Sequence, residues 1–323
     1  MTSAWWPQAV PEHLLASHND LDLSLCGQGL DQRANAEVIF ASGEPYDAAV
    51  LDALPSAQII ARIGIGYDAV DLDAATERGI LVTNTPEGPT TSTAEHAVAL
   101  MLAVSHQLTE SAARLRAGAG DYVAQQRSME LDGRTLGLLG FGRIGQAVAT
   151  MARAIWMHVT VADPALMPTP ESDPAVGLGV EVVELDELFS RLDVLSIHAP
   201  ATKSTIGLID ASAFDAMKPG SVLVNTARGP IVNTDDLVSA LQSGHLLGAG
   251  LDVTDPEPLS PDHPLLGMDN VIVTPHIASS TVAGRKRMND MAFEQVAMAL
   301  RGEIPTHLLN PEALNQPNCA LAQ

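Results

Sequence analysis

Cysteine is almost absent from this sequence of 323 residues. Cys26 and Cys319 are the only two, they lie far apart, and they form neither a CxxC pair nor the spacing of metal ligands. Such a pair offers no disulfide framework, and the ten histidines include no HExxH motif and no cluster with cysteine of the kind that binds zinc. We therefore expect no metal site and a protein that works in a reducing compartment.

Basic residues are also scarce. Seventeen lysines and arginines stand against 39 aspartates and glutamates, which gives a formal net charge of −22. A protein that binds nucleic acid needs a basic stripe to neutralise phosphates, so this composition argues against a nucleic-acid partner. The acidity favours solubility, and any arginine that binds an anion here must do so in a local, well-shaped site.

Long apolar runs are missing as well. No run approaches the roughly 20 residues that span a bilayer, and the opening residues, MTSAWWPQAV, have neither the basic nor the apolar region of a signal peptide. We expect no membrane partner and a cytoplasmic location. Because only 3% of the residues are aromatic, aliphatic side chains must fill the core, and the length predicts two domains.

The most informative stretch follows residue 134. An apolar run at 135–139 predicts a strand, Gly140, Gly142 and Gly145 then stand in the spacing G-x-G-x-x-G, and apolar residues at helical intervals follow. In this spacing the first glycine permits a tight turn, the second lets the backbone approach a pyrophosphate, and the third lets helix and strand pack closely. The free N–H groups of the helix N-terminus favour an anion, so the stretch predicts a dinucleotide site.

An acidic residue supports this prediction. A second strand at 159–162 leads to Asp163, close to the spacing of about 20 residues at which such folds bind the adenosine ribose. Its carboxylate would accept hydrogen bonds from the ribose hydroxyls and repel a 2′-phosphate, so NAD is favoured over NADP. The ordinary alternative is a turn in which Asp163 caps the segment before Pro164.

Strand-like runs and helical patterns alternate along the chain, which is typical of an α/β protein with a doubly wound parallel sheet. Further strands are expected at 37–41, 58–63, 80–83, 180–182, 194–198, 221–225, 248–252 and 271–274, and helices at 45–54, 72–78, 186–189, 210–217, 233–243 and 281–301. One long helix is expected from 92 to about 116, capped by Thr91 or by Ser92, which would form a capping box with Glu95. The tail after Pro311 is expected to be loosely ordered.

Polar residues follow several of these strands. The loop RIGIGYDAVDL, 62–72, contains two glycines whose backbone amides could hold a small anion, or it is a plain turn. Arg228 in VNTARGP, Glu257 in DVTDPEP and His276 in VTPHIASS also lie at or beyond strand ends. Ligands bind outside the carboxyl ends of such strands, so these three are expected to converge, although each alone has an ordinary explanation as a surface, loop or capping residue.

Taken together, GFGRIG, VNTARGPIV, LDVTDPEPL, TPHIASST and RIGIGYDAVDL resemble the D-isomer-specific 2-hydroxyacid dehydrogenase family over nearly the whole chain. The resemblance implies an α/β fold of two doubly wound Rossmann-like domains. A flavodoxin-like substrate domain would form from both chain ends, residues 1–98 and 288–323, and an NAD-binding Rossmann domain, residues 99–287, would be inserted. Family members are commonly homodimers.

The resemblance also implies roles. The arginine of NTARG, Arg228, binds the substrate carboxylate and keto oxygen, the histidine of the PH motif, His276, is the general acid or base, and the acid of the EP motif, Glu257, is hydrogen-bonded to it. Hydride transfer to a 2-oxo acid puts negative charge on the carbonyl oxygen, which a guanidinium and a proton donor both stabilise. The implied function is an NAD-dependent oxidoreductase that interconverts 2-hydroxy and 2-oxo acids.

Other positions matched to the family supply cofactor and substrate contacts. The implied cofactor contacts, besides the glycines and Asp163, are Thr85, Arg143, Ile144, Ala199, Thr226 and Asp252. The backbone amides of Ile65 and Gly66 would hold the substrate carboxylate.

The substrate stays open. Arg62 matches a position that helps to hold the phosphate in phosphoglycerate dehydrogenases of this family, but no further basic residue stands in its loop. Reduction of glyoxylate or hydroxypyruvate fits comparably well, and Ile65, where phosphite dehydrogenases have lysine, argues against phosphite. An NAD-sensing transcriptional corepressor shares the fold and the same three residues, so the motifs do not prove turnover. Trp156 departs from the family, which usually has glycine there.

Overall fold

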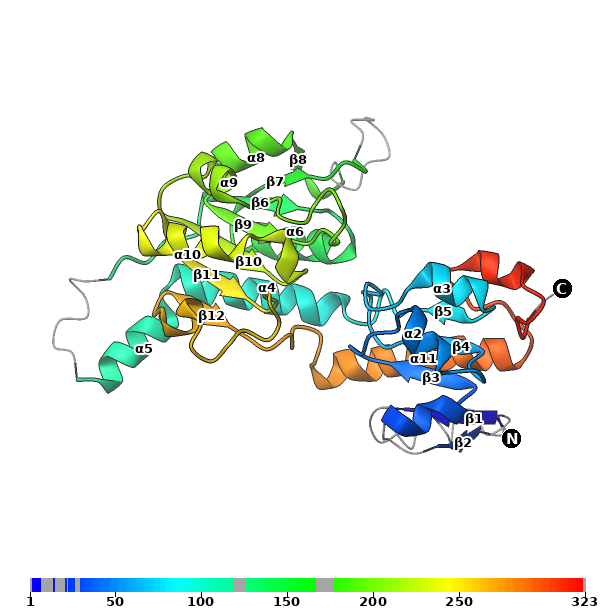
Figure 1. The fold of residues 1–323 in the computed structure, drawn as a ribbon. Coiled ribbons are helices and arrows are strands. Elements are labelled where there is room, and N and C mark those ends of the chain that lie inside the picture. Colours follow the sequence, from blue (N-terminus) through cyan, green and yellow to red (C-terminus); the bar gives the residue numbers. More distant parts are fainter. Residues whose placement is uncertain are drawn as a thin grey trace. The chain divides into compact units, whose positions relative to one another are not determined.

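The computed structural model describes residues 2–6, 14, 21, 23–26, 30–118, 126–166 and 177–321, and it divides into two compact units (Figure 1). The terminal unit consists of Met1–Pro89 and Val282–Gln323, and the central unit is Thr90–Thr281. One unit is thus formed from both chain ends, and the other is inserted between them in the sequence.

The terminal unit contains a sheet of five parallel strands in the order β2-β1-β3-β4-β5. This is the flavodoxin-like order, so the expected fold class is confirmed here. The strands are β1 (Thr2–Trp5), β2 (Leu23–Leu25), β3 (Val38–Ala41), β4 (Ile59–Arg62) and β5 (Leu81–Thr83). The last three were predicted, whereas the sequence pattern indicated neither β1 nor β2.

Both faces of this sheet are covered, because neighbouring strand residues point to opposite sides. On one face Trp6 and Phe40 pack with ring centroids 4.0 Å apart, and Phe293 stacks on Phe40 at 5.8 Å. On the other face Trp5 and Ile39 are fully buried. The helices of the unit are η1 (Leu30–Asn35), α2 (Ala48–Asp52), α3 (Leu72–Glu77), α11 (Val282–Leu300) and η4 (Pro311–Asn315).

The predicted loose ordering of the tail is wrong as far as residue 321. Ala313 in η4 and Cys319 are buried. The side chain of Asn310 makes hydrogen bonds to the backbone of β5 and of the residue before it. Its Oδ1 accepts a hydrogen bond from Val82 N at 2.8 Å and its Nδ2 donates to Ile80 O at 2.9 Å. These contacts join parts of the chain more than 220 residues apart, so local sequence gives no signal for them.

The central unit contains seven parallel strands in the order β12-β11-β10-β9-β6-β7-β8. Counted from β6, this is the 3-2-1-4-5-6 order of dinucleotide-binding folds with one further strand. The strands are β6 (Thr135–Leu139), β7 (His158–Ala162), β8 (Glu181–Val182), β9 (Val194–Ile197), β10 (Ser221–Asn225), β11 (Leu246–Leu251) and β12 (Val271–Val273). All seven strands were predicted, and the order reverses between β6 and β9.

Helices cover both faces of the central sheet. The α-helices are α4 (Thr90–Ser105), α5 (Leu108–Arg116), α6 (Arg143–Ala154), α8 (Leu185–Arg191), α9 (Ala211–Ala216) and α10 (Thr234–Gln242), with short 3-10 turns η2 (Gly229–Ile231) and η3 (Pro264–Gly267). Apolar side chains of α4 and α6 form one core with alternate strand residues, and those of α8, α9 and α10 form the other. Figure 1 shows α4 running beside β10 and β11, which it contacts.

The predicted single helix from 92 to 116 is wrong. Gln107 has a left-handed backbone, with φ of 51°, and it separates α4 from α5. The predicted capping box is also wrong, because α4 begins at Thr90 and Ser92 is buried inside its first turn. The hydroxyl of Ser92 lies 2.7 Å from that of Thr281 instead. Among the described residues, no helix combines the length and apolar character needed to cross a membrane.

Candidate active site and cofactor-binding turn

The candidate site lies at the carboxyl edge of the central sheet. All seven strands are parallel, so the loops that follow them share one edge. The loops after β6 and β7 contain the glycine motif and Asp163, and those after β10, β11 and β12 contain Arg228, Glu257 and His276. The point between β6 and β9, where the strand order reverses, is where such folds open a crevice for a ligand.

Two glycines of the motif are required by the backbone around them. Gly140 has φ of 94°, and a Cβ there would lie 2.8 Å from the backbone of His198 and Ala199. A Cβ at Gly145 would lie 2.4 Å from the carbonyl oxygen of Gly140. The first glycine therefore permits the turn, and the last lets α6 approach β6 closely.

The middle glycine has a different environment. Gly142 is the N-cap of α6, no side chain caps it, and a Cβ there would meet nothing within 4 Å. This space lies before the helix N-terminus formed by Arg143 and Ile144 and could admit a pyrophosphate. Thr226 is a second feature that fits a ligand site, because its Oγ1 is buried with no hydrogen-bond partner among the described residues. The residues present therefore fit a dinucleotide.

Asp163 holds the glycine turn in place. Its Oδ2 accepts a hydrogen bond from Phe141 N at 2.7 Å, and its Oδ1 accepts one from Ala165 N at 2.9 Å. Each carboxylate oxygen keeps a further acceptor position. The sequence predicted a contact with the ribose for this residue and missed its role in fixing the turn.

A histidine beside the turn was not singled out from the sequence. His198 follows β9, its Nε2 lies 2.9 Å from Ser196 Oγ, and its backbone contacts the glycine turn. Burial lowers the pKa of His198 to about 4, so the imidazole is neutral at neutral pH. The turn is thus bordered by an uncharged side chain that adds no positive charge of its own.

The structure pairs Glu257 with His276. The Nδ1 of His276 lies 2.7 Å from Glu257 Oε1, and Glu257 Oε2 accepts a hydrogen bond from Thr254 N at 3.3 Å. The side chains of His276 and Glu257 are 46% and 42% exposed, respectively, so the pair is open to solvent. Since the carboxylate holds Nδ1, the ring is oriented, and Nε2 is the nitrogen that Glu257 does not contact.

Asp252 holds the loop of His276. Its carboxylate is fully buried and accepts hydrogen bonds from Ile277 N at 2.9 Å and Ala278 N at 2.8 Å. The backbone oxygen of Asp252 accepts a bond from His276 N at 2.8 Å. His276 itself has a left-handed backbone, with φ of 53°, a conformation that needs such support in a residue other than glycine.

Arg228 lies on the neighbouring loop, which Asn225 shapes. Asn225 Oδ1 accepts a hydrogen bond from Ala227 N at 3.0 Å, and its Nδ2 donates to Arg228 O at 2.9 Å. A Cβ at Gly229 would lie 1.9 Å from Thr254 O, so this loop packs directly on the one that leads to Glu257. Sequence reasoning missed Asn225 and Gly229, although both stand beside Arg228 in the same motif.

The remaining candidate residues belong to the terminal unit. Thr85 Oγ1 accepts a hydrogen bond from Gly64 N at 2.8 Å, and Thr85 N donates to Gly64 O at 3.0 Å. Asn84 Nδ2 donates to Ile65 O at 2.8 Å. The loop with the amides of Ile65 and Gly66 is therefore fixed against the segment that follows β5.

Arg62 ends β4, and its guanidinium folds back over this loop. Its Nη1 donates to Ile63 O at 2.7 Å and lies 3.5 Å from Ala41 O. A Cβ at Gly64 would be 3.1 Å from the same nitrogen. Arg62 thus supports the backbone of the loop that bears the candidate substrate amides.

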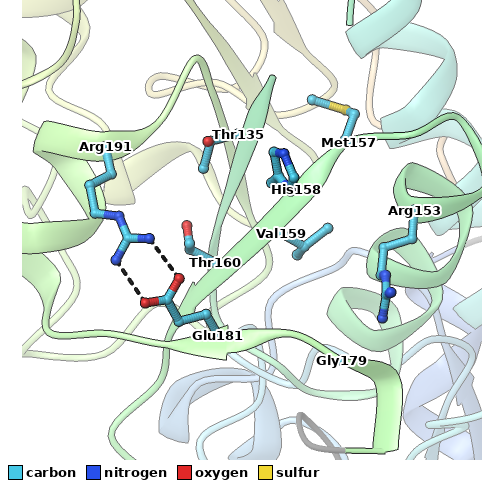
Figure 2. A pocket seen from close by; sticks show the side chains of 9 residues that line it. All are labelled: Thr135, Arg153, Met157, His158, Val159, Thr160, Gly179, Glu181 and Arg191. Carbon is cyan, nitrogen blue, oxygen red and sulfur yellow. Dashed lines mark hydrogen bonds and ion pairs between the residues drawn. The ribbon is translucent and has the colours of Figure 1, made fainter. Parts of the chain in front are cut away.

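A separate cavity of about 340 Å³ lies at the amino ends of β6 and β7 (Figure 2). It is at the edge of the sheet opposite to the glycine turn, since Thr135 and His158 begin those strands. Arg191 points to Glu181 there, with Nη2 2.6 Å from Oε2, and also pairs with Glu187. Two carboxylates neutralise this guanidinium, and we assign the cavity no part in the candidate site. In the described part of the chain, no three His, Cys, Asp or Glu side chains form a group that could hold a metal ion.

The sheet order, the glycine turn and the buried Thr226 hydroxyl are those of a dinucleotide-binding protein of the Rossmann type. A paired histidine and carboxylate lie at the same edge of the sheet.

Comparisons with known proteins identify the family. A profile described as "D-isomer specific 2-hydroxyacid dehydrogenase, NAD binding domain" matches residues 98–278. A glyoxylate reductase of Thermofilum pendens is 38% identical over 96% of this chain and 87% of its own length. A D-3-phosphoglycerate dehydrogenase of Mycobacterium leprae is 42% identical over 86% of this chain, which spans only 51% of that relative.

A crystal structure agrees with these matches. The D-lactate dehydrogenase of Aquifex aeolicus, complexed with NAD and lactic acid, is 29% identical, and the match covers 95% of this chain and 99% of its own with a TM-score of 0.83. The chain belongs to the D-isomer-specific 2-hydroxyacid dehydrogenase family, and NAD is its cofactor.

Proposed function

We propose that this chain interconverts a small 2-hydroxy acid and its 2-oxo acid, with His276 as general acid and base, Glu257 as its partner and Arg228 as the substrate-binding residue. The observation that carries the proposal is the 2.7 Å contact between His276 Nδ1 and Glu257 Oε1. It lies at the sheet edge that also bears the glycine turn, and the loop of Arg228 packs on the loop that leads to Glu257.

NADH, when bound, would supply the hydride that C2 of the 2-oxo acid accepts. As the carbonyl oxygen gains negative charge, His276 delivers a proton to it from Nε2, which completes the 2-hydroxy acid. The carboxylate of Glu257 holds Nδ1–H and stabilises the imidazolium before the proton leaves. In the reverse direction, neutral His276 takes the hydroxyl proton through Nε2.

Arg228 supplies fixed positive charge for the substrate. A guanidinium stays protonated, and its planar donors match a carboxylate and the neighbouring carbonyl oxygen together. It would therefore orient the acid and stabilise the developing negative charge. In a chain with a net charge of −22, this attraction must be local, and the Asn225 bonds that fix the loop support that.

The cofactor contacts follow the turn. Gly140, Gly142 and Gly145, with Arg143 and Ile144 at the start of α6, would hold the pyrophosphate, and Asp163 would accept from the adenosine ribose. Ala199, Thr226, Asp252 and Thr85 are assigned to the rest of the dinucleotide. The unpartnered Thr226 Oγ1 and the open space at Gly142 support this arrangement.

Each unit receives one task in this proposal. We assign dinucleotide binding to the central unit and substrate binding to the terminal unit, whose Ile65 and Gly66 amides would hold the substrate carboxylate. The bonds that pin this loop to Thr85 and Asn84 support the assignment, because a fixed backbone presents its amides in one direction. The family resemblance also favours a homodimer, which light scattering of the purified protein tests.

For the substrate we propose an unphosphorylated 2-oxo acid such as glyoxylate or hydroxypyruvate. The bonds that Arg62 makes to the backbone carbonyls of Ile63 and Ala41 support this choice, because they give the guanidinium a structural role. The other possibility uses Arg62 for a substrate phosphate. In that case Arg62→Ala would lower kcat/KM for phosphohydroxypyruvate far more than for glyoxylate, whereas our proposal predicts similar losses.

The test of the catalytic assignment is a comparison of His276→Ala and Arg228→Ala with the wild type. Loss of a general acid is expected to lower kcat about 10²- to 10⁴-fold, while NADH binds within about twofold of the wild type. Arg228→Ala should raise KM for the oxo acid as well as lower kcat. Turnover of His276→Ala near the wild-type rate would refute the role of His276.

A further inference from the structure

A second histidine lies close to the loop of His276. His96 is on α4, with its side chain 22% exposed, and its Nε2 is 3.0 Å from Thr274 Oγ1 and 3.5 Å from Asp252 Oδ1. All four residues belong to the central unit. The proposed reaction does not use His96, although it touches the two residues that fix the His276 loop.

The surrounding hydrogen bonds determine which atom is the donor in the contact between His96 Nε2 and Thr274 Oγ1. Thr274 Oγ1 lies 2.6 Å from Asp252 Oδ1, and a carboxylate can only accept, so the single hydroxyl hydrogen of Thr274 belongs to that bond. Thr274 Oγ1 then has only acceptor positions left for His96. His96 Nε2 must therefore carry a hydrogen and donate it to Thr274.

The hydrogen bond from His96 fixes the Thr274 hydroxyl, which in turn donates to Asp252. Its Oδ1 accepts from Thr274 Oγ1 and from Ile277 N, which occupies both of its acceptor positions. Its Oδ2 accepts from Ala278 N at 2.8 Å and keeps one position. The carboxylate is thus held in one orientation, with one acceptor position left for a ligand.

Helix α4 also supports the far end of the same loop. Ser92 lies one turn before His96, and its hydroxyl is 2.7 Å from that of Thr281. The loop is therefore tied to α4 near its start, through Thr274, and near its end, through Thr281. His276, with its left-handed backbone, lies between the two attachments.

We propose that His96 is a positioning residue for hydride transfer: its Nε2–H fixes the Thr274 hydroxyl, and through it the Asp252 carboxylate and the loop of His276. This inference rests on the proposed function. Without this donor, the Thr274 hydroxyl and the Asp252 carboxylate can adopt more than one orientation. The Asp252 oxygen assigned to the cofactor and the His276 imidazole assigned to the substrate then both become less ordered.

The test uses three variants of the full chain. His96→Leu removes the donor at similar size, His96→Gln keeps an N–H donor at a similar distance from the backbone, and His106→Leu is the control because His106 is exposed just beyond the end of α4. We expect His96→Leu to lower kcat for glyoxylate at least tenfold, with KM changed less than threefold. His96→Gln should stay within threefold of the wild type, as should the control.

Hydrogen exchange separates this inference from the proposed function. The amides of Ile277 and Ala278 donate to Asp252, so His96→Leu should speed their exchange at least tenfold, while His96→Gln and His106→Leu leave it unchanged. Hydrogen exchange can be measured without turnover. If the wild type reduces no oxo acid, the proposed function is refuted, but the role of His96 in fixing the loop can still be tested. Unchanged exchange in His96→Leu, or equal loss of kcat in the Leu and Gln variants, would overturn the role of His96. If His96→Leu does not fold, His96→Asn, whose amide is too short to reach Thr274, takes its place in both measurements.

Discussion

One methyl group at Gly145 and one at Gly142 are expected to damage different properties of the protein. At Gly145 the new Cβ would lie 2.4 Å from the carbonyl oxygen of Gly140, and both atoms are fixed to backbone. Helix α6 must therefore move away from β6. Overpacking of this kind costs about 1–3 kcal/mol of unfolding free energy, which corresponds to a fall in Tm of roughly 2–12 °C for a unit of this size.

At Gly142 the same substitution meets nothing within 4 Å. Its φ of −67° and ψ of −169° are open to any residue, and loss of glycine at an N-cap costs at most about 1 kcal/mol. The methyl group would occupy the space assigned to the pyrophosphate, however. We expect Gly142→Ala to raise the Kd for NADH at least tenfold, a loss of about 1.4 kcal/mol of binding free energy.

Thermal unfolding without cofactor and fluorescence titration with NADH separate the two effects. Gly145→Ala should unfold at a clearly lower temperature than the wild type, whereas Gly142→Ala should unfold within about 4 °C of the wild type and bind NADH weakly. Wild-type stability of Gly145→Ala would refute the packing argument. Equal NADH affinity of Gly142→Ala and the wild type would refute the assignment of that space to the pyrophosphate.

Three further predictions concern Trp156, His198 and Asp163. Trp156 has φ of 63° and is 73% exposed, and a left-handed backbone costs a residue other than glycine about 1–2 kcal/mol. Trp156→Gly should therefore raise the free energy of unfolding, measured by urea denaturation, by up to about 1 kcal/mol. A decrease in this free energy would contradict the argument. The pKa of His198 is about 4 in the folded protein and about 6.5 in the unfolded chain. Between about pH 4 and about pH 6.5 the unfolded chain therefore binds a proton at His198 that the folded protein does not bind. The free energy of unfolding should fall by up to about 3 kcal/mol as the pH drops from about 6.5 to about 4. His198→Asn should lose that part of the pH dependence, and an unchanged slope would exclude His198 as its source. Asp163→Asn removes the charge expected to repel a 2′-phosphate, so the ratio of NADPH to NADH affinity should rise at least tenfold, and an unchanged ratio would argue against the ribose contact.

Much of the fold was predictable because it depends on local patterns. The strands of the central sheet are short apolar runs between turn residues, and the three glycines keep a spacing that few other structures require. Strands β1 and β2 were missed because neither is an apolar run: their sequences are TSAW and LSL. The break between α4 and α5 was missed because the left-handed residue there is Gln107, and no glycine or proline near it marks a helix end.

The candidate site was predictable to the level of its motifs and no further. Glu257 and His276 are marked by residue type and by their places after strands, and the structure brings them together. The bonds that hold them come from residues distant in sequence: Ser92 is 189 residues from Thr281, and His96 is 178 residues from Thr274. Ser92 has the sequence pattern of a helix cap, and only the tertiary structure shows that its hydroxyl is used elsewhere.

The most direct test of the account is NADH oxidation by the purified protein with glyoxylate, hydroxypyruvate, phosphohydroxypyruvate and pyruvate as separate substrates. The account predicts turnover that depends on the oxo acid, with glyoxylate or hydroxypyruvate preferred over the phosphorylated acid. Preference for phosphohydroxypyruvate would contradict the proposed substrate and return Arg62 to a phosphate-binding role. No turnover with any of the four acids, in a buffer where NADH still binds, would contradict the enzymatic role and favour a protein that senses NAD.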